Sequence, residues 1–239
     1  MRFATSLDNS HSMRNRLLLI GLSLGLLACM FFYTKAEADA PAPYNAELTF
    51  EQAEKSVFYL RALRSDGTVR SVGSGVVIDS KGTAATAYHV VKDADDLEAV
   101  FEDGRVVTGI KTKQFDELTD AALLTLPDSW TKQGKSQAYI PVRKAEVKHG
   151  ERVFALGYPL KNTVIITEGI VNSPNAEING RERILTSAQI ASGMSGGPLV
   201  DEKGNLIGII SGSLRTMNNI HLAVDMGDLR ILLDKTAKK

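Results

Sequence analysis

The chain has 239 residues, of which 44% are hydrophobic and 23% charged, a composition typical of a globular protein with one or two domains. Disordered, collagen-like and coiled-coil chains are thereby excluded. Lys+Arg and Asp+Glu number 28 each, so no net charge attracts polyanions and we expect no nucleic-acid partner. The single cysteine, Cys29, excludes an internal disulfide and a Cys-based metal site.

An apolar segment near the N-terminus comes first in the chain. Residues 17–33 are almost all apolar, follow two arginines, and precede two overlapping Ala-x-Ala sites in residues 36–40. This order is typical of a bacterial export signal, with cleavage expected after Ala38. The sequence therefore predicts residues 1–38 as a signal peptide or N-terminal membrane anchor, and an exported protein that is periplasmic or secreted.

Two other interpretations of this segment stay open. Its 17 residues are at the short limit for crossing a hydrocarbon core of ~30 Å, so an uncleaved inner-membrane anchor is the first. The second is a lipoprotein signal, because residues 26–29 resemble a lipobox. Against it, the apolar run continues beyond Cys29, where a polar tether is expected.

The rest of the chain has the pattern of a β protein. After a spacer at 39–47, residues 48–55 predict a short helix, and β-branched runs then alternate with Gly, Asp-Gly and Pro up to about Asp225. The polar segment 127–136 divides the runs into two sets of about six, and residues 226–238 predict a closing helix. The predicted strands are 57–63, 70–79, 83–88, 97–101, 105–114, 121–126, 137–142, 152–156, 163–171, 182–188, 197–200, 205–213 and 219–224.

Three residues spaced along this pattern indicate acyl-transfer chemistry. Ser195 lies among glycines that allow a tight turn with inward-facing N–H groups, which can bind a developing oxyanion. His89 ends one predicted strand, and Asp120 opens the apolar run 121–126. Each alone has an ordinary structural explanation. Together they supply a nucleophile, a base and an orienting carboxylate, which need no metal or cofactor.

Six segments in order resemble the trypsin-like serine peptidases of the HtrA/DegP kind over about residues 50–225. The resemblance implies two perpendicular six-stranded antiparallel barrels, about 57–126 and 137–224, within a protease domain at 48–239. The active site would lie in the cleft between the barrels. The matching segments are 73–79, 86–91, 120–123, 155–159, 167–171 and 193–199.

The same resemblance assigns a role to each matching residue. Ser195 would be the nucleophile, His89 the general base and then acid, and Asp120 the group that orients His89. The backbone N–H groups of Gly193 and Ser195 would form the oxyanion hole. Met194 stands where the family usually has Asn or Asp. No cofactor and no metal are expected.

The family pattern also places a specificity pocket. Its residues would be Gln189, Ile190, Gly212 and Leu214, none of them acidic, so we expect small or medium apolar substrate side chains. HtrA-like proteins usually continue into PDZ domains. This chain ends 14 residues after Asp225, so we expect no PDZ domain in it.

The resulting prediction is a serine endopeptidase that hydrolyses peptide bonds through an acyl-enzyme. Its partners would be protein or peptide substrates, in particular exposed or unfolded envelope proteins. The alternatives are a catalytically incompetent protease fold that only binds peptides, and a structural partner of another envelope protein anchored through residues 17–33. Related proteins are often trimers, so a homo-oligomer is a further expectation.

Overall fold

The computed structural model divides into two units, residues 1–44 and 45–239. In the first unit the described residues are helical and exposed, and the thiol of Cys29 is free. Among all the described residues, no helix is long and apolar enough to span a membrane. The predicted cleavage site at Ala38 and most of the spacer lie outside the described residues. These are 20–21, 23–31, 46–131, 138–214 and 216–237.

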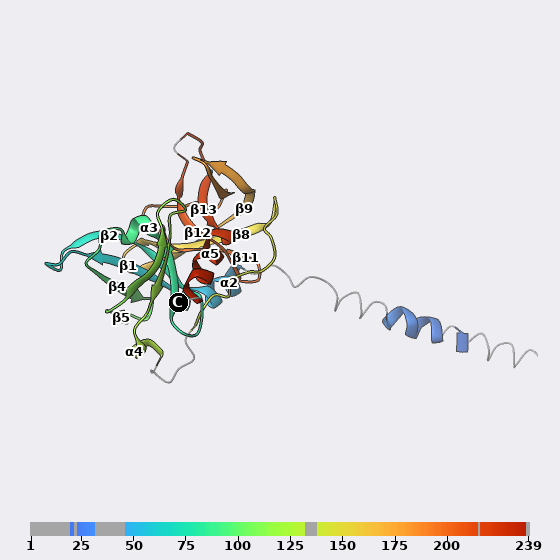
Figure 1. The fold of residues 1–239 in the computed structure, drawn as a ribbon. Helices are drawn as coiled ribbons and strands as arrows, with labels where there is room; N and C mark the ends of the chain where they lie inside the picture. The colour runs from blue at the N-terminus through green and yellow to red at the C-terminus, as the bar shows by residue number, and fades with distance from the viewer. Residues whose placement is uncertain (1–19, 22, 32–45, 132–137, 215, 238–239) are drawn as a thin grey trace, which may run out of the picture. The chain divides into compact units, whose positions relative to one another are not determined.

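The second unit begins with a short helix, and the sheet that follows it forms the first lobe (Figure 1). The strands make one seven-stranded antiparallel sheet in the order β5-β4-β1-β2-β3-β7-β6. Two short helices, α3 and α4, follow β3 and β7. The elements are α2 Ala46–Ala53, the 3-10 helix η1 Glu54–Ser56, β1 Val57–Leu63, β2 Val69–Val77, β3 Thr83–Ala87, α3 Tyr88–Val91, β4 Asp96–Phe101, β5 Val106–Val107, β6 Lys111–Asp116, β7 Ala121–Thr125 and α4 Asp128–Thr131.

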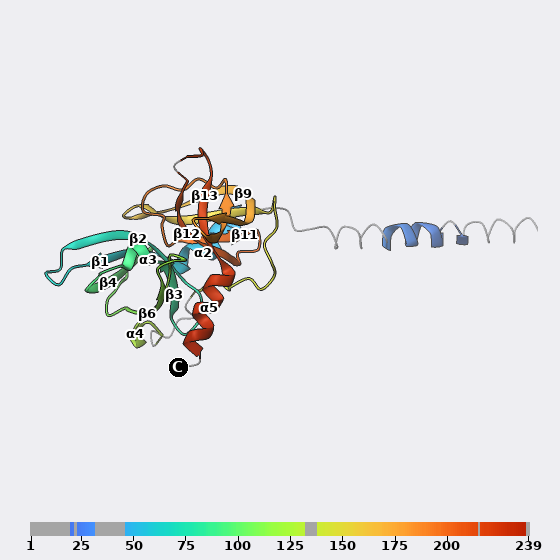
Figure 2. The ribbon, with the colours of Figure 1, turned by 45° about the horizontal axis from the view of Figure 1, so that its top comes forward.

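The second lobe is a closed six-stranded barrel in the order β10-β13-β12-β11-β8-β9. The chain then ends in helix α5, which packs against β6 and β7 of the first lobe (Figure 2). The elements are β8 Arg152–Leu160, β9 Thr163–Ile178, β10 Arg181–Thr186, β11 Pro198–Asp201, β12 Leu206–Ser213, β13 His221–Asp225 and α5 Met226–Ala237.

The predicted all-β class, the two lobes and the C-terminal helix are confirmed. Four strand predictions differ from the structure by more than two residues. The predicted strand 105–114 is divided into β5 and β6 at residues 108–110, where Gly109 has φ of 74°, and β8 continues past residue 156 to Leu160. The other two are 137–142 and 163–171. Residue 137 lies outside the described residues, and 138–142 form no strand, because Pro141 has no N–H to donate and only Val142 forms an isolated bridge, with Leu206. Strand β9 runs past residue 171, since Asn179 and Gly180, both at positive φ, turn it directly back into β10.

The first lobe also differs in shape from the expected six-stranded barrel. Its seven strands include the two-residue strand β5 and form a sheet whose terminal strands, β5 and β6, are not paired with each other. Only the second lobe is a closed barrel. The interior of each lobe nevertheless has its own apolar cluster, as the alternating burial of the strands requires.

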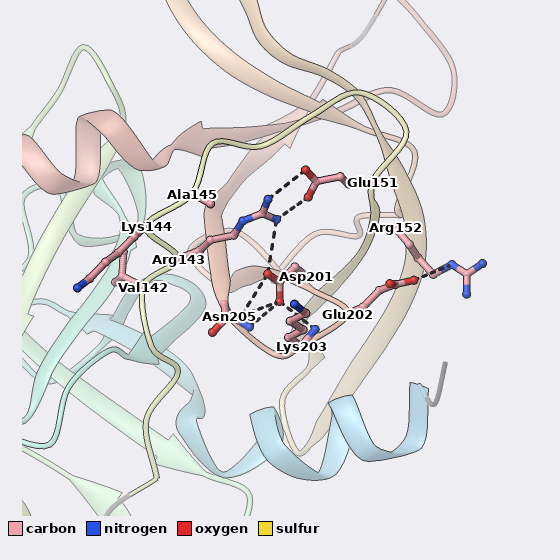
Figure 3. A pocket seen from close by; sticks show the side chains of 10 residues that line it. All are labelled: Val142, Arg143, Lys144, Ala145, Glu151, Arg152, Asp201, Glu202, Lys203 and Asn205. Atoms are coloured by element: carbon pink, nitrogen blue, oxygen red, sulfur yellow. Dashed lines mark hydrogen bonds and ion pairs between the residues drawn. The ribbon is translucent and has the colours of Figure 1, made fainter. Parts of the chain in front are cut away.

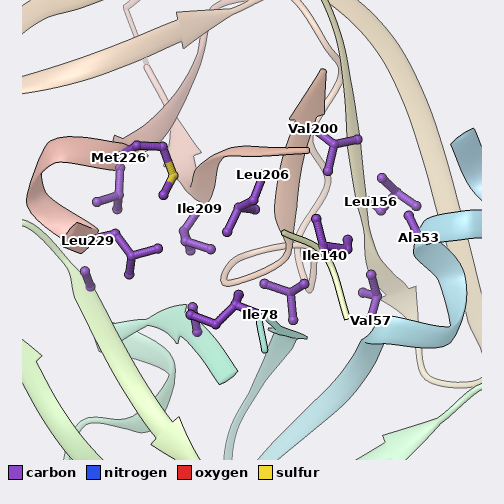
Figure 4. Close-up of a cluster of buried hydrophobic side chains, with 14 of the residues drawn as sticks. Ala53, Val57, Ile78, Ile140, Leu156, Val200, Leu206, Ile209, Met226 and Leu229 are labelled. Atoms are coloured by element: carbon purple, nitrogen blue, oxygen red, sulfur yellow. The ribbon is translucent and has the colours of Figure 1, made fainter. Parts of the chain in front are cut away.

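A third apolar cluster joins the two lobes (Figure 4). Val57 and Ile78 of the first lobe pack there with Leu156 and Ile209 of the barrel, and α2 and α5 close its sides. These side chains are at most 5% exposed, and burying one of that size contributes about 1.5–3 kcal/mol. The cluster therefore fixes how the lobes face each other, and with that the geometry of the seam between them.

Candidate active site

His89 and Asp120 form a hydrogen-bonded couple in the first lobe. His89 lies in α3, directly after β3, and Asp120 ends the turn that leads into β7. The Nδ1 atom of His89 is 2.9 Å from Oδ2 of Asp120, and the backbone N–H of His89 donates to Oδ1 at 2.9 Å. Since a carboxylate only accepts, Nδ1 carries the proton and Nε2 of the neutral ring is left as an acceptor.

The hydrogen bonds between the two side chains raise the pKa of His89 and lower the pKa of Asp120. The hydrogen bond to Asp120 raises the pKa of His89 above 6.5, against the opposing effect of burial. Burial by itself raises the pKa of Asp120, but the hydrogen bonds from His89 and Ser211 outweigh it, so the pKa lies below 3.8. Asp120 is therefore ionised at neutral pH and stabilises a protonated His89.

Asp120 has further partners from both lobes. The hydroxyl of Ser211 on β12 donates to Oδ2 at 2.6 Å, and the backbone oxygen of Asp120 accepts from the N–H of Tyr88 at 3.1 Å. The residue has φ of 58°, a left-handed conformation that Asp adopts more readily than most residues. Its backbone and carboxylate together hold the start of α3 and the ring of His89.

The loop that carries Ser195 lies against β2 and β3. The N–H of Ser74 donates to the backbone oxygen of Ser195 at 2.7 Å. A Cβ added to Gly73 would be 2.8 Å from that same oxygen and from a methyl of Val90, the residue after His89. Gly196, with φ of 86°, leaves no space for a side chain, because an added Cβ would be 2.2 Å from Ser74 O and Thr86 Oγ1. The fold thus brings the serine loop next to α3.

The predicted oxyanion donors lie at the turn of this loop. Gly193 has φ of 95°, and its carbonyl accepts from the Ser74 hydroxyl at 2.8 Å. Among the described residues, none accepts a hydrogen bond from the N–H of Gly193 or of Ser195. Both N–H groups therefore lack a protein acceptor, and their role as an oxyanion hole stays a prediction.

Within the described residues, no hydrogen bond joins Ser195 Oγ to His89 Nε2. The two residues are near each other through their neighbours. Gly73 lies between the Ser195 backbone oxygen and Val90, the residue after His89. Nucleophile-base hydrogen bonds are often long before substrate binds and shorten in the complex. The assignment of Ser195 as nucleophile thus stays a prediction, which the placement of the loop makes feasible.

Met194 is buried inside the barrel rather than exposed in the loop. Its side chain is 1% exposed and packs in the apolar cluster that contains Ala188 and Ile190. The sulfur accepts the N–H of Ala191 at 3.4 Å, and the N–H of Met194 donates to the Ala191 oxygen at 3.1 Å. A thioether fills irregular apolar space well, so Met194 anchors the loop in the core.

The four predicted pocket residues lie around the loop and the end of β12. Gln189 is exposed and its amide donates to Asn219 at 3.1 Å, while Ile190 packs partly into the barrel cluster. A Cβ added to Gly212 would meet nothing within 4 Å, so that side of β12 is open. Leu214 lies just past β12, held by its N–H to the Ile220 oxygen at 3.1 Å.

A pocket of about 630 Å³ lies elsewhere, between β8 and the β11–β12 turn (Figure 3). Its charged side chains pair with one another: Arg143 binds Glu151 and Asp201, and Arg152 lies near Glu202. None of the predicted site residues lines it. Within the described part of the chain, no group of three or more His, Cys, Asp or Glu side chains is placed to hold a metal ion.

Sequence reasoning missed two serines that organise this site. Ser211 was not distinguished from any other strand residue, and only the pairing of the lobes places it on Asp120. Ser74 belongs to the Gly-Ser-Gly segment that carried the family resemblance, yet its role was not assigned. Its hydroxyl joins the Gly193 carbonyl to the Tyr158 N–H, and so ties the serine loop to the end of β8.

A two-lobed β fold with a His-Asp couple beside a glycine-rich serine loop defines the class of trypsin-like peptidases. The family described as trypsin-like peptidase domain matches residues 73–209. The solved serine endoprotease from Yersinia pestis is 27% identical, with a TM-score of 0.69, and the match covers 84% of this chain and 69% of that one.

Curated relatives agree with this class. The serine endoprotease DegS of Escherichia coli K12 is 34% identical over 182 residues, which cover 72% of this chain and 49% of DegS. Protease Do-like 1 of Arabidopsis thaliana chloroplasts is 33% identical over 177 residues, which cover 67% and 39%. The chain belongs to the trypsin-like peptidase family, in its HtrA/DegS group. The chain spans about half the length of DegS and a smaller share of Protease Do-like 1.

Replacement of Met194 tests whether core packing holds the serine loop. Met194→Leu keeps the volume and should cost less than about 1.5 kcal/mol. Met194→Asn introduces the residue type usual in the family, but buries an amide among apolar side chains, which costs about 1–3 kcal/mol if the amide is unpaired. Urea unfolding measures the change in the free energy of unfolding for both variants.

The control is Met217→Asn, at a methionine that is 54% exposed, which should change stability by less than about 0.5 kcal/mol. A Met194→Asn protein as stable as the wild type would contradict the anchoring role.

Proposed function

We propose that the protein is a serine endopeptidase that hydrolyses peptide bonds through an acyl-enzyme. The observation that carries this proposal is the His89–Asp120 couple, with Nδ1 held at 2.9 Å and Nε2 free to accept a proton. Family membership adds support, because the matched region contains His89, Asp120 and Ser195. The substrates proposed are exposed or unfolded segments of envelope proteins.

In the proposed reaction His89 Nε2 takes the proton of Ser195 Oγ as the oxygen attacks the substrate carbonyl. The imidazolium that forms is stabilised by ionised Asp120, whose pKa lies below its usual value. His89 then returns the proton to the leaving amine, and a water molecule repeats the sequence to hydrolyse the acyl-enzyme. Asp120 keeps the ring in the tautomer that this proton transfer needs.

The negative charge on the substrate oxygen would be stabilised by the N–H groups of Gly193 and Ser195. Backbone donors placed before the reaction need no reorganisation when the charge forms, and each contributes about 2.7–4 kcal/mol in comparable sites. The free N–H groups at this turn favour catalysis over the alternative, a protease fold that only binds peptides. A fluorophosphonate probe, which reacts only with an activated serine, separates the two.

The triad prediction is tested by Asp120→Asn and Ser195→Ala. Since only neutral His89 acts as a base and its pKa is raised, the labelling rate of the wild type should rise with pH through a midpoint above 6.5. Asp120→Asn favours the wrong tautomer and should lower turnover by roughly 10⁴-fold. Peptide hydrolysis and mass mapping of the labelled residue measure these effects.

The controls separate loss of catalysis from loss of folding. Asn tolerates φ near 58° as Asp does, so Asp120→Asn should fold with wild-type circular dichroism. Ser195→Ala should bind no probe. Near wild-type turnover in folded Asp120→Asn would show that another group orients His89.

Substrate preference is expected to be for small or medium apolar side chains before the cleaved bond. Gln189, Ile190, Gly212 and Leu214 offer no carboxylate to pair with Lys or Arg, and an unpaired buried cation is strongly unfavourable. A peptide library cleaved by the wild type, with Ser195→Ala as the blank, gives the profile. Cleavage mainly after Lys or Arg would refute this pocket assignment.

Export is proposed from residues 17–33 and the site at Ala38. N-terminal sequencing of protein from a bacterial envelope fraction should give a chain that starts near Asp39. A first residue inside the leader would indicate the inner-membrane anchor instead, and a diacylated Cys29 would indicate a lipoprotein. Self-association into a homo-oligomer also stays a proposal, which the mass of the mature protein in solution decides.

A further inference from the structure

A buried arginine of the barrel is bound to the turn that ends in Asp120. Arg183 lies on β10 and is 8% exposed. Its Nη1 donates to the backbone oxygen of Thr119, and its Nη2 donates to the oxygen of Leu118 at 3.3 Å. These are the two residues immediately before Asp120. The barrel thus reaches across the seam and binds the turn directly.

The other side of the same two peptide groups is also held. Oδ1 of Asp116 accepts the N–H of Leu118 at 2.9 Å and that of Thr119 at 3.1 Å. Asp116 and Arg183 therefore bind the donors and the acceptors of Leu118 and Thr119. The next residue, Asp120, has φ of 58°, a conformation that a free turn would seldom keep.

A buried guanidinium is energetically unfavourable unless its charge and its N–H donors are paired. Burying a cation costs free energy that two carbonyl acceptors recover only in part. Arg183 is close enough to Asp228 to act on it electrostatically: burial raises the pKa of Asp228, Arg183 opposes that rise, and Asp116 adds to it. An apolar side chain would pack here more simply, so the charged fork has a specific geometric use.

We propose that Arg183 is a positioning residue for the His89–Asp120 couple. It fixes the turn 116–120 in the conformation that aims the Asp120 carboxylate at Nδ1 of His89. Arg183 touches no reacting atom, and its effect passes through Asp120 alone. This inference rests on the proposed peptidase function, since it concerns the same couple.

The test compares Arg183→Met, Arg183→Lys and the control Arg143→Met. Met removes the charge and both donors but keeps most of the side-chain volume, while Lys keeps the charge and can bind one carbonyl. Arg143 lies in the segment before β8, is 17% exposed at its side chain, and binds Glu151 and the Glu146 oxygen instead of the turn. Its replacement should lower thermal stability without affecting the couple.

The readout is the rate of fluorophosphonate labelling as a function of pH, with the fold checked by circular dichroism. We expect Arg183→Met to lower the maximal rate by about 10- to 100-fold, the effect of a small misplacement of a catalytic group. Its midpoint should fall toward 6.5, because His89 loses part of its bond to Asp120. Arg183→Lys should give intermediate values, and Arg143→Met the wild-type rate and midpoint.

Each result separates this inference from the peptidase proposal. A wild type that does not label at any pH would refute the proposed function itself. A labelled wild type with an unchanged rate and midpoint in folded Arg183→Met would overturn only the positioning role. If the Met variant does not fold, Arg183→Lys decides alone: wild-type values overturn the inference, and a slower rate with a lower midpoint supports it.

Discussion

The Asp120 carboxylate is the point on which the two lobes converge. It accepts from the backbone and ring of His89 in the first lobe and from the Ser211 hydroxyl in the second. These bonds keep it ionised despite burial, which alone would raise its pKa. A change in the relative position of the lobes would break the bond to Ser211 and weaken the hold on His89. The chemistry of the site therefore depends on the packing of the seam.

The contact between the lobes depends on a shared apolar cluster and on glycines at positions where a side chain would not fit. The apolar cluster shared by the lobes holds them face to face. Side chains at Gly73 and Gly196 would prevent the close approach of the serine loop to β2 and β3, because their Cβ atoms would clash with neighbouring atoms. An added Cβ at Gly196 would lie 2.2 Å from Ser74 O, so the backbone would have to move to remove the clash. Glycine is needed here for close approach as much as for its positive φ.

The parts of this arrangement that are local in sequence could be predicted. Runs of β-branched residues separated by turn residues predicted most strands within one or two positions, and the matching segments pointed to His89, Asp120 and the Ser195 loop. Residues that act across the seam could not be found this way: Ser211 is 91 residues from Asp120, and Arg183 is 64 from Thr119. The sequence showed Met194 only as a departure from the family's usual Asn or Asp, because its burial depends on how the barrel closes. No pattern within a segment records contacts made by another segment.

Strand β10 gives this non-local arrangement a single physical basis. Arg183, in its middle, binds the turn before Asp120, and the strand then runs through Thr186 into the loop that carries Ser195. A strand in a closed barrel is paired on both edges and rises about 3.3 Å per residue, so it acts as a rigid spacer between two anchored points. After the strand ends at Thr186, the chain reaches Met194, whose side chain packs in the barrel core. The turn before Asp120 and the loop that carries Ser195 are therefore both attached to the barrel, the first through Arg183 and the second through Met194.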